Sequence, residues 1–334
     1  MDLASRRLWR EARLEARLVW IFGSPRTGST WLMNLLSHPL ITDNGIASGV
    51  GRLDAPEADR PRTIPINEPY VQDHLAPAFS LPVLEEGDVP VSTLPEFRHA
   101  EPNYLLADRY VEAWRPALRT LVLARLEAQA RVVAREHRVP AGPIVIKEPN
   151  GSLAAGFVMS LFPRSRMIFL LRDGRDVVDS MVDAQMPGGW LASPLAERAE
   201  QHRRERLTLV KRESRMWLAR TQAVRRAYEA HPPELRRLVR YEELLSDTPR
   251  VLAELEQWLD VRRTAAGHAD ALRWNDFAAA PAESKGRGKP MRAAQPGLWR
   301  ENLDAREQAA MHEMMGDELA ALGYKVQPAA VGTP

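Results

Sequence analysis

The stretch VWIFGSPRTGSTWL, residues 19–32, decides the fold. It opens with an apolar run typical of a buried strand, passes through a turn that holds Gly23 and Gly28, and continues into a helical pattern. Turn amides and the amino end of a helix then point into one concave site, an arrangement that binds phosphate-like anions. Arg26 adds a fixed positive charge, and hydroxyl donors come from Thr27, Ser29 and Thr30. The stretch therefore predicts an anion-binding loop between a strand and a helix.

The spacing of the two glycines matches the start of a Walker A loop, which continues with lysine and then serine or threonine. Here the next residues are Ser29 and Thr30, so the lysine that contacts a nucleoside triphosphate is missing, and the cation lies inside the loop at Arg26. The run MIFLLRD, which ends at Asp173, nevertheless resembles a Walker B strand. A P-loop kinase or NTPase that uses Mg-ATP therefore stays open as an alternative, as does a non-catalytic nucleotide-binding or scaffold protein.

Apolar runs of strand length recur along the chain, with helical patterns between them. They cover residues 18–23, 143–147, 166–172 and 236–241. Continuous apolar strands that alternate with helices predict a parallel sheet covered on both faces, here a three-layer, P-loop-like α/β domain with about five strands. Helices are expected at residues 29–37, 103–137 with a break or kink at Pro116, 176–184, 194–230, 249–259 and 305–322.

Two irregular regions interrupt this pattern. Residues 40–115 begin with a proline-rich part of little periodicity, and so long an irregular stretch usually carries function, here the expected acceptor pocket. Residues 280–302 are rich in glycine and basic side chains. No clean linker or internal repeat is present, so residues 1–334 are predicted to form a single domain with two insertions. Residues 1–17 are expected to form a basic amphipathic helix that packs on this domain.

The composition excludes several classes of protein. The 334 residues contain no cysteine, which excludes disulfide scaffolds, cysteine nucleophiles and thiolate metal sites. Lysine and arginine together number 46 against 44 acidic residues, a balance that does not suggest a nucleic-acid polymer as the partner. The sequence shows neither a secretory signal nor an apolar run of about 18 residues, which favours a cytoplasmic protein without a membrane span.

A second motif, LLRDGRDVVDS, follows the third predicted strand at residues 170–180. Asp173 and Gly174 are expected to form a turn, and Asp176 is expected to cap the helix that follows. Arg172 leaves the carboxyl end of the strand, where open α/β sheets bind their ligands. Arg172 and Ser180 are therefore candidate contacts to one anion, and a surface cluster of ion pairs is the structural alternative.

With both motifs on one chain, the sequence resembles the PAPS-dependent sulfotransferases, in the bacterial form that carries arginine in the loop. PAPS is 3′-phosphoadenosine 5′-phosphosulfate, and PAP is its product after transfer. SPRTGSTW resembles the family's 5′-phosphosulfate loop, which implies cofactor contacts from Pro25, Arg26, Thr27, Gly28, Ser29, Thr30 and the adenine-stacking Trp31. Arg172 and Ser180 match the family's 3′-phosphate motif, and Tyr241 in VRYEELLSDTP matches a tyrosine beside the adenine.

Residues 280–302 resemble the family's basic, glycine-rich loop, which closes over the 3′-phosphate. This resemblance implies cofactor contacts from Lys285, Gly286 and Arg287, with Arg292 and Arg300 as further candidates. The sequence does not decide which of these cations touches the ligand. The family contains both monomers and homodimers, and both states remain open for this chain.

The resemblance implies transfer of a sulfuryl group from PAPS to a hydroxyl of a small alcohol or phenol, by an in-line displacement that needs no metal. Arg26 and the loop amides are expected to stabilise charge that builds on the leaving phosphate, and Lys147 matches a lysine that some family members keep beside the transferred group. Cytosolic members use a histidine two residues after this lysine, where the chain has Pro149, so their general base is absent. Tyrosylprotein sulfotransferases use a glutamate after the first helix, and Glu68 is chosen here. The other candidates for the base are Glu148, His74 and His99.

Overall fold

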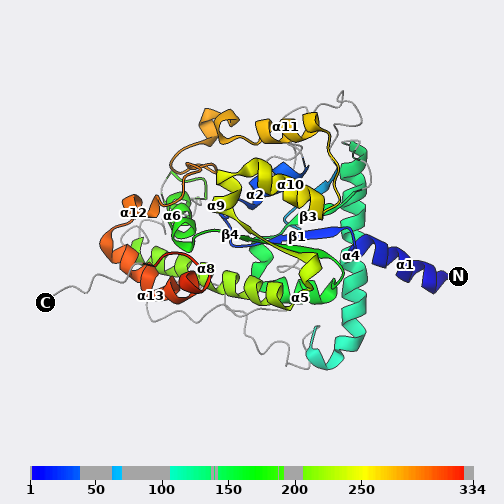
Figure 1. Ribbon diagram of the computed structural model, residues 1–334. Coiled ribbons are helices and arrows are strands. Elements are labelled where there is room, and N and C mark those ends of the chain that lie inside the picture. Colours follow the sequence, from blue (N-terminus) through cyan, green and yellow to red (C-terminus); the bar gives the residue numbers. More distant parts are fainter. Residues whose placement is uncertain are drawn as a thin grey trace. The chain divides into compact units, whose positions relative to one another are not determined.

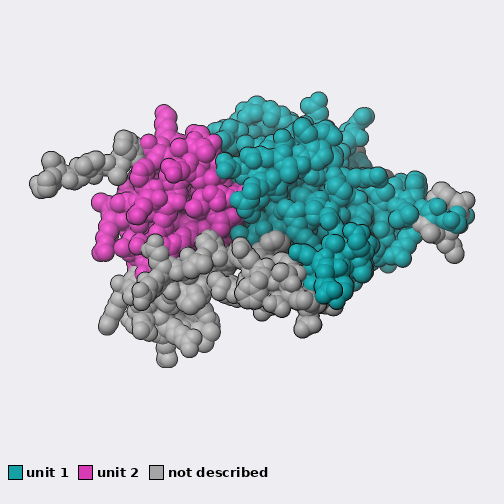
Figure 2. All heavy atoms as spheres, turned by 90° about the horizontal axis from the view of Figure 1, so that it is seen from below, with its two compact units in different colours: residues 1–79, 94–171, 223–279 teal, residues 80–93, 172–222, 280–334 magenta. Residues whose placement is uncertain are grey.

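The computed structural model of the protein describes residues 2–37, 62–69, 106–136, 139, 142–186, 188–191 and 206–326. The candidate bases His74 and His99 and most of the expected acceptor pocket lie outside the described residues. The chain forms two compact units (Figure 2), the first of residues 1–79, 94–171 and 223–279 and the second of residues 80–93, 172–222 and 280–334. Each unit gathers stretches that are far apart in the sequence.

The first unit is built on a parallel sheet of five strands in the order β2-β3-β1-β4-β5 (Figure 1). The strands are β1 (Leu18–Phe22), β2 (Ile64–Asn67), β3 (Ile144–Lys147), β4 (Arg166–Leu171) and β5 (Arg236–Arg240). Four of them confirm the strands predicted from apolar runs. The exception is β2, which was not predicted because its short run IPIN contains Pro65 and lies in a region without periodicity. It lies at the edge of the sheet, where a proline is tolerated because fewer ladder hydrogen bonds need a donor.

The central strand β1 is buried along its whole length, as its unbroken apolar run predicts. The ring centroid of Trp20 lies 5.9 Å from that of Phe22 and 5.8 Å from that of Phe162, and both pairs are stacked. In the register of the sheet, Ile21 of β1 is level with Lys147 of β3, which is level with Asn67 of β2. The chain segments that follow these three strands therefore leave the same edge of the sheet.

Helices cover both faces of this sheet, which confirms the predicted three-layer α/β class. In Figure 1, α2 and α10 lie on one side of the strands and α5 lies on the other. The 26-residue helix α4 continues through Pro116 without the expected break, and it carries the N-terminal helix α1 through ion pairs such as Arg119–Glu15 at 2.6 Å. The helices of this unit are α1 (Leu3–Glu15), α2 (Ser29–Ser37), α4 (Val111–Glu136), α5 (Ala155–Leu161), α9 (Tyr241–Ser246), α10 (Thr248–Trp258) and α11 (Ala265–Trp274).

The second unit is built around helix α6 (Gly174–Gln185). Gly174 packs on the indole of Trp217, and a Cβ there would come within 2.7 Å of the ring. The expected cap at Asp176 is wrong. Asp173 caps the helix and accepts from the amide of Arg175 at 3.0 Å, so Asp176 lies inside the first turn and is buried. The other helices are α8 (Arg206–Ala230), which continues into the first unit, α12 (Trp299–Asn302) and α13 (Ala305–Ala321).

Candidate functional site

The loop between β1 and α2 is closed by its own hydrogen bonds and by one residue from a distant segment. Thr27 Oγ1 donates to the Ser24 carbonyl at 2.8 Å. Ser152 Oγ accepts from the Gly23 amide at 3.1 Å and donates to the Gly23 carbonyl at 2.7 Å. Ser29 and Thr30 begin α2, and the first amides of a helix have no acceptor within it. The expected strand, turn and helix are all present, with amides available to an anion.

Strained backbone marks two of the candidate catalytic residues. Arg26 has a φ of 71° and Glu68 has a φ of 36°, in the left-handed region that residues with a Cβ avoid. Among the described residues, only four positions other than glycine have a positive φ. Each costs roughly 1–3 kcal/mol and persists only where the surroundings hold it, which is a feature of functional sites. Both residues lie in segments that follow the carboxyl ends of strands.

Lys147 brings the candidate base and the phosphate loop together. Its Nζ lies 2.6 Å from Glu68 Oε1 and donates to Thr30 Oγ1 at 2.9 Å. The other carboxylate oxygen, Oε2, accepts from Asn150 Nδ2 at 2.8 Å. The side chains of Lys147 and Glu68 are 8% and 15% exposed, so water reaches this ion pair only in part. Three residues chosen from separate sequence segments therefore meet in one contact, because the register of β2 and β3 places their ends side by side.

The remaining described base candidate, Glu148, occupies a different environment. Its side chain is fully buried beneath the 3₁₀ turn η4 (Asn150–Ala154). A Cβ added at Gly151 would lie 2.6 Å from Glu148 Cγ, so backbone closes over the carboxylate. An acceptor molecule cannot reach a wholly enclosed group without rearranging the turn. Glu68 retains exposed surface, and the geometry therefore favours it over Glu148 as the base.

Two residues expected to lie beside the adenine, Trp31 and Tyr241, meet Gly28 of the phosphate loop in the first unit. The ring of Tyr241, the first residue of α9, lies against Gly28, where a Cβ would come within 2.8 Å of Tyr241 Cδ2. Gly28 has a φ of 89°, a second reason why glycine is needed there. Trp31 and Tyr241 form an edge-to-face pair with centroids 6.0 Å apart, and Trp31 Nε1 donates to the Asn275 carbonyl at 2.9 Å. The phosphate loop is therefore flanked by an aromatic pair.

In the second unit, the start of α6 contains one of the ion pairs that the structural alternative expected. Asp173 holds the guanidinium of Arg175 through both oxygens, at 2.9 and 2.7 Å, and Arg175 also stacks on Trp299. Burial raises the pKa of Asp176, although the nearby Arg172 acts in the opposite direction. Arg172 lies outside the Asp173–Arg175 pair at the end of β4, and Ser180 lies buried on α6. Their contact with a phosphate stays a prediction.

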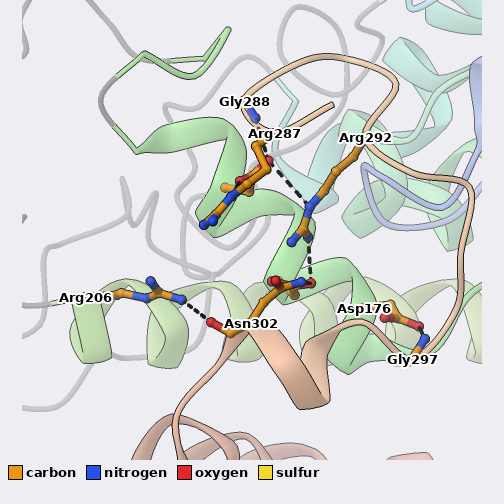
Figure 3. Close-up of polar contacts among 9 residues, drawn as sticks. Asp176, Arg206, Arg287, Gly288, Arg292, Gly297 and Asn302 are labelled. Carbon is orange, nitrogen blue, oxygen red and sulfur yellow. Dashed lines mark hydrogen bonds and ion pairs between the residues drawn. The ribbon is translucent and has the colours of Figure 1, made fainter. Parts of the chain in front are cut away.

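The basic loop at residues 280–302 is tied back on itself and onto α6. The Gly286 amide donates to the Met291 carbonyl at 3.0 Å, and Lys285 and Met291 form an isolated bridge. Two of the three arginines of this segment differ in exposure: the side chain of Arg287 is 80% exposed, whereas that of Arg292 is 12% exposed and lies 2.6 Å from Asp179 (Figure 3). This difference separates Arg287, which was expected to contact the cofactor, from Arg292, which was a further candidate.

The sequence analysis missed four residues that support these sites, namely Asn150, Ser152, Asp179 and Asp183. The signal for the first pair was the tripeptide NGS at residues 150–152, which follows the predicted strand 143–147 after two intervening residues. The signal for the second pair was the recurrence of aspartate every three or four residues along the helix after Arg172, which places them on one face.

The described part of the chain lacks two features. Residues 2–37, 62–69, 106–136, 139, 142–186, 188–191 and 206–326 contain no group of three His, Asp or Glu side chains that could hold a metal ion. Over the same residues, no helix is both long and apolar enough to cross a membrane.

Comparison with known proteins identifies the family. A family model described as the sulfotransferase family matches residues 19–265, which include both sequence motifs, Glu68, Lys147 and Tyr241. Since this match covers more than half of the sequence, the chain belongs to the sulfotransferase family. A search of curated proteins finds no match.

Similar solved structures also carry the sulfotransferase name. Sulfotransferase STF9 from Mycobacterium avium is 17% identical, with a TM-score of 0.49, and the alignment covers 97% of this chain and 81% of that one. The sulfotransferase domain of the Synechococcus PCC 7002 olefin synthase is 16% identical, with a TM-score of 0.45 and coverage of 93% and 95%. Mouse sulfotransferase SULT7A1, complexed with PAP, is 12% identical, with a TM-score of 0.46 and coverage of 91% and 84%.

Proposed function

We propose that the protein is a PAPS-dependent sulfotransferase that moves a sulfuryl group, in line and without a metal, to the hydroxyl of a small alcohol or phenol. The contact of Lys147 with both Glu68 and Thr30 carries this proposal, since it joins a candidate base to the anion-binding loop. Membership of the sulfotransferase family and the missing Walker lysine both disfavour the Mg-ATP alternative. The cytoplasmic location and the choice between monomer and homodimer stay predictions.

The described residues of the first unit fit the 5′ end and the base of PAPS. The first amides of α2 and the guanidinium of Arg26 suit the sulfate-bearing phosphate. The backbone cradle at Gly28, which leaves no room for a Cβ, and the pair of Trp31 and Tyr241 suit the adenine. The proposed contacts to the 3′-phosphate lie in the second unit, and they are Arg172, Ser180, Lys285, Gly286 and Arg287.

PAPS, when bound, supplies an activated sulfuryl group on a good leaving group. Lys147 has three N–H donors, of which one serves Glu68 and one serves Thr30. The third remains for an oxygen that gains negative charge. Thr30 accepts from Lys147, so its own O–H is left to donate toward an anion in the loop.

The proposed role of Glu68 is to accept the proton of the acceptor hydroxyl. Lys147 and Asn150 each bind one carboxylate oxygen, which fixes the plane of the group. Each oxygen has a second lone pair, so a hydroxyl can still donate to this carboxylate. Side chains held in this way need no further ordering at the moment of transfer, and that lowers the barrier.

One calorimetric experiment tests the cofactor. PAP and ATP are titrated separately into the protein, each with and without Mg²⁺. We expect PAP to bind with micromolar affinity whether or not Mg²⁺ is present, since the proposed contacts are arginine, lysine, hydroxyl and amide groups. ATP binding that requires Mg²⁺, with no binding of PAP, would overturn the proposal in favour of the kinase alternative.

A second experiment tests the base. The protein is incubated with PAPS labelled in its sulfuryl group and a panel of simple phenols and alcohols, and labelled products are separated. Glu68→Gln is expected to lower turnover by roughly 10²–10⁴-fold while PAP affinity persists, because it removes the proton acceptor and keeps the shape. Glu313→Gln, an exposed glutamate on α13, is the matched control. Near-normal turnover of Glu68→Gln would reject Glu68 as the base.

A further inference from the structure

Three aspartates on one face of α6 hold the basic loop in place. Asp176, Asp179 and Asp183 follow one another at intervals of three and four residues, so they share a face of the helix. We call them the aspartate ladder. The oxygens of Asp176 and Asp183 accept from the amides of Gly297 at 2.8 Å and Gly288 at 2.7 Å (Figure 3). Two backbone amides far apart in the loop are thus fixed by two carboxylates of one helix.

The middle carboxylate holds side chains instead of backbone. Asp179 Oδ2 lies 2.6 Å from the guanidinium of Arg292 and accepts from Asn302 Nδ2 at 3.0 Å. Arg292 also reaches Asp183, at 3.5 Å. Because its guanidinium is bound by two carboxylates and is nearly buried, Arg292 anchors the loop and has little freedom to meet a ligand.

Arg287 is held by this ladder more loosely than Arg292. Its Nε lies 3.5 Å from Asp183 Oδ1, a loose ion pair, and its side chain is 80% exposed. Exposed ion pairs of this kind hold a side chain weakly, so leaving Asp183 costs Arg287 little. Asp183 therefore contacts a firmly bound part of the loop, the Gly288 amide, and a loosely bound side chain, Arg287.

Ser180 lies on the same side of α6 as Asp176 and Asp183. It follows Asp176 by four residues and precedes Asp183 by three, so the three side chains are neighbours along the helix. A 3′-phosphate bound at Ser180, as the proposed function has it, would lie one helical turn from Asp183. The carboxylate of Asp183 would then repel the phosphate and compete with it for Arg287.

From these contacts we infer that Asp183 is a positioning residue with two opposed effects on cofactor binding. Its hydrogen bond to Gly288 keeps the loop in the shape that receives the 3′-phosphate, and its charge weakens the binding of that phosphate. The inference rests on the proposed function, and it concerns how tightly PAP is held and how readily it leaves.

Two substitutions separate the effects. Asp183→Asn keeps an oxygen that accepts from the Gly288 amide but removes the charge, whereas Asp183→Ala removes both. Asp317→Asn, an exposed aspartate on α13, controls for the general change in net charge. PAP and adenosine 5′-phosphosulfate, which lacks the 3′-phosphate, are titrated into each protein at low and high salt.

We expect Asp183→Asn to bind PAP roughly three- to tenfold more tightly than the wild type, with the gain shrinking at high salt because ions screen the charge. Binding of adenosine 5′-phosphosulfate should not change. Asp183→Ala should bind PAP more weakly than Asp183→Asn, because the loop loses an anchor. Hydrogen exchange without any ligand should be faster across residues 285–291 in Asp183→Ala than in Asp183→Asn.

The outcomes distinguish this inference from the function on which it rests. If the wild type binds PAP and Asp183→Asn binds it no more tightly than Asp317→Asn does, the inference about charge is wrong and the proposed function stands. Equal hydrogen exchange in the alanine and asparagine variants would overturn the anchoring role. A wild type that binds no PAP overturns the proposed function, and the charge effect of Asp183 falls with it.

Discussion

Replacement of Lys147 by methionine should destabilise the protein, and a second substitution at Glu68 should restore part of the loss. Lys147→Met keeps the length and apolar volume of the side chain but removes the ammonium group. The carboxylate of Glu68, which is 15% exposed, then loses its paired charge and, among the described residues, keeps only the hydrogen bond from Asn150. Adding Glu68→Gln in that background removes a charge that has lost its partner.

The exposure of the Lys147–Glu68 ion pair determines how much unfolding free energy the substitution should cost. Removing one partner of a buried ion pair costs about 3–5 kcal/mol of unfolding free energy, because the other charge stays behind without compensation. Glu68 keeps one donor and some contact with water, so we expect the lower end for Lys147→Met, about 3 kcal/mol. The double variant should recover about 1–2 kcal/mol of this loss, and the coupling energy of the full cycle should be about 2 kcal/mol.

Urea unfolding of the wild type, the two single variants and the double variant at pH 7 measures the cycle. The ion pair Arg250–Glu254 is the matched control, since its charges lie 2.8 Å apart but are 49% and 61% exposed. Its cycle, made with Arg250→Met and Glu254→Gln, should give a much smaller coupling energy, because water and salt screen an exposed pair. A double variant at Lys147 and Glu68 that is no more stable than Lys147→Met alone would show that Glu68 is not left as an uncompensated charge.

Three further predictions rest on single contacts. Asn150→Ala should lower turnover by roughly tenfold and leave PAP affinity intact, because Glu68, the proposed base, loses the donor that orients its carboxylate. An equal loss of PAP affinity would contradict this role of Asn150. Burial lowers the pKa of His231 below its ordinary 6.5, so the wild type should lose stability as the pH falls below about 6.5, when the unfolded chain binds the proton first. Urea midpoints at pH 7.5 and 5 should therefore differ less in His231→Gln, and an unchanged difference counts against the assignment. Arg292→Gln should lower the thermal midpoint by several degrees while Arg287→Gln leaves it unchanged, and equal shifts would show that the two arginines play one role.

The strands and the phosphate loop could be predicted from sequence because their signals are local. An unbroken apolar run specifies a strand buried on both faces, and two glycines with hydroxyl residues specify an anion loop wherever the rest of the chain goes. The edge strand β2 escaped prediction since its four residues include Pro65, and a short strand of this kind is defined by its neighbour in the sheet.

Contacts that depend on strand register or on packing between distant segments could not be predicted from the sequence. Glu68 and Lys147 could each be chosen as candidates, but their ion pair exists only because Asn67 and Lys147 are level in the sheet. The aspartates of α6 have the spacing of a solvated helix face, and only the packed loop shows that they are bound and that Asp176 and Asp179 are buried. The misplaced helix cap has the same origin, since Asp173 and Asp176 are equally good caps until the exit of β4 is fixed.

The register of β2 against β3 has a consequence for evolution. Successive residues of a strand face opposite sides, so a single-residue insertion or deletion within Ile64–Asn67 would turn the segment over relative to β3. The side chain of Glu68 would then no longer be placed to contact Lys147, although no residue of the site itself had changed. Among descendants of this chain, the spacing between the start of β2 and the glutamate should therefore be as invariant as the glutamate, even where the surrounding residues diverge freely.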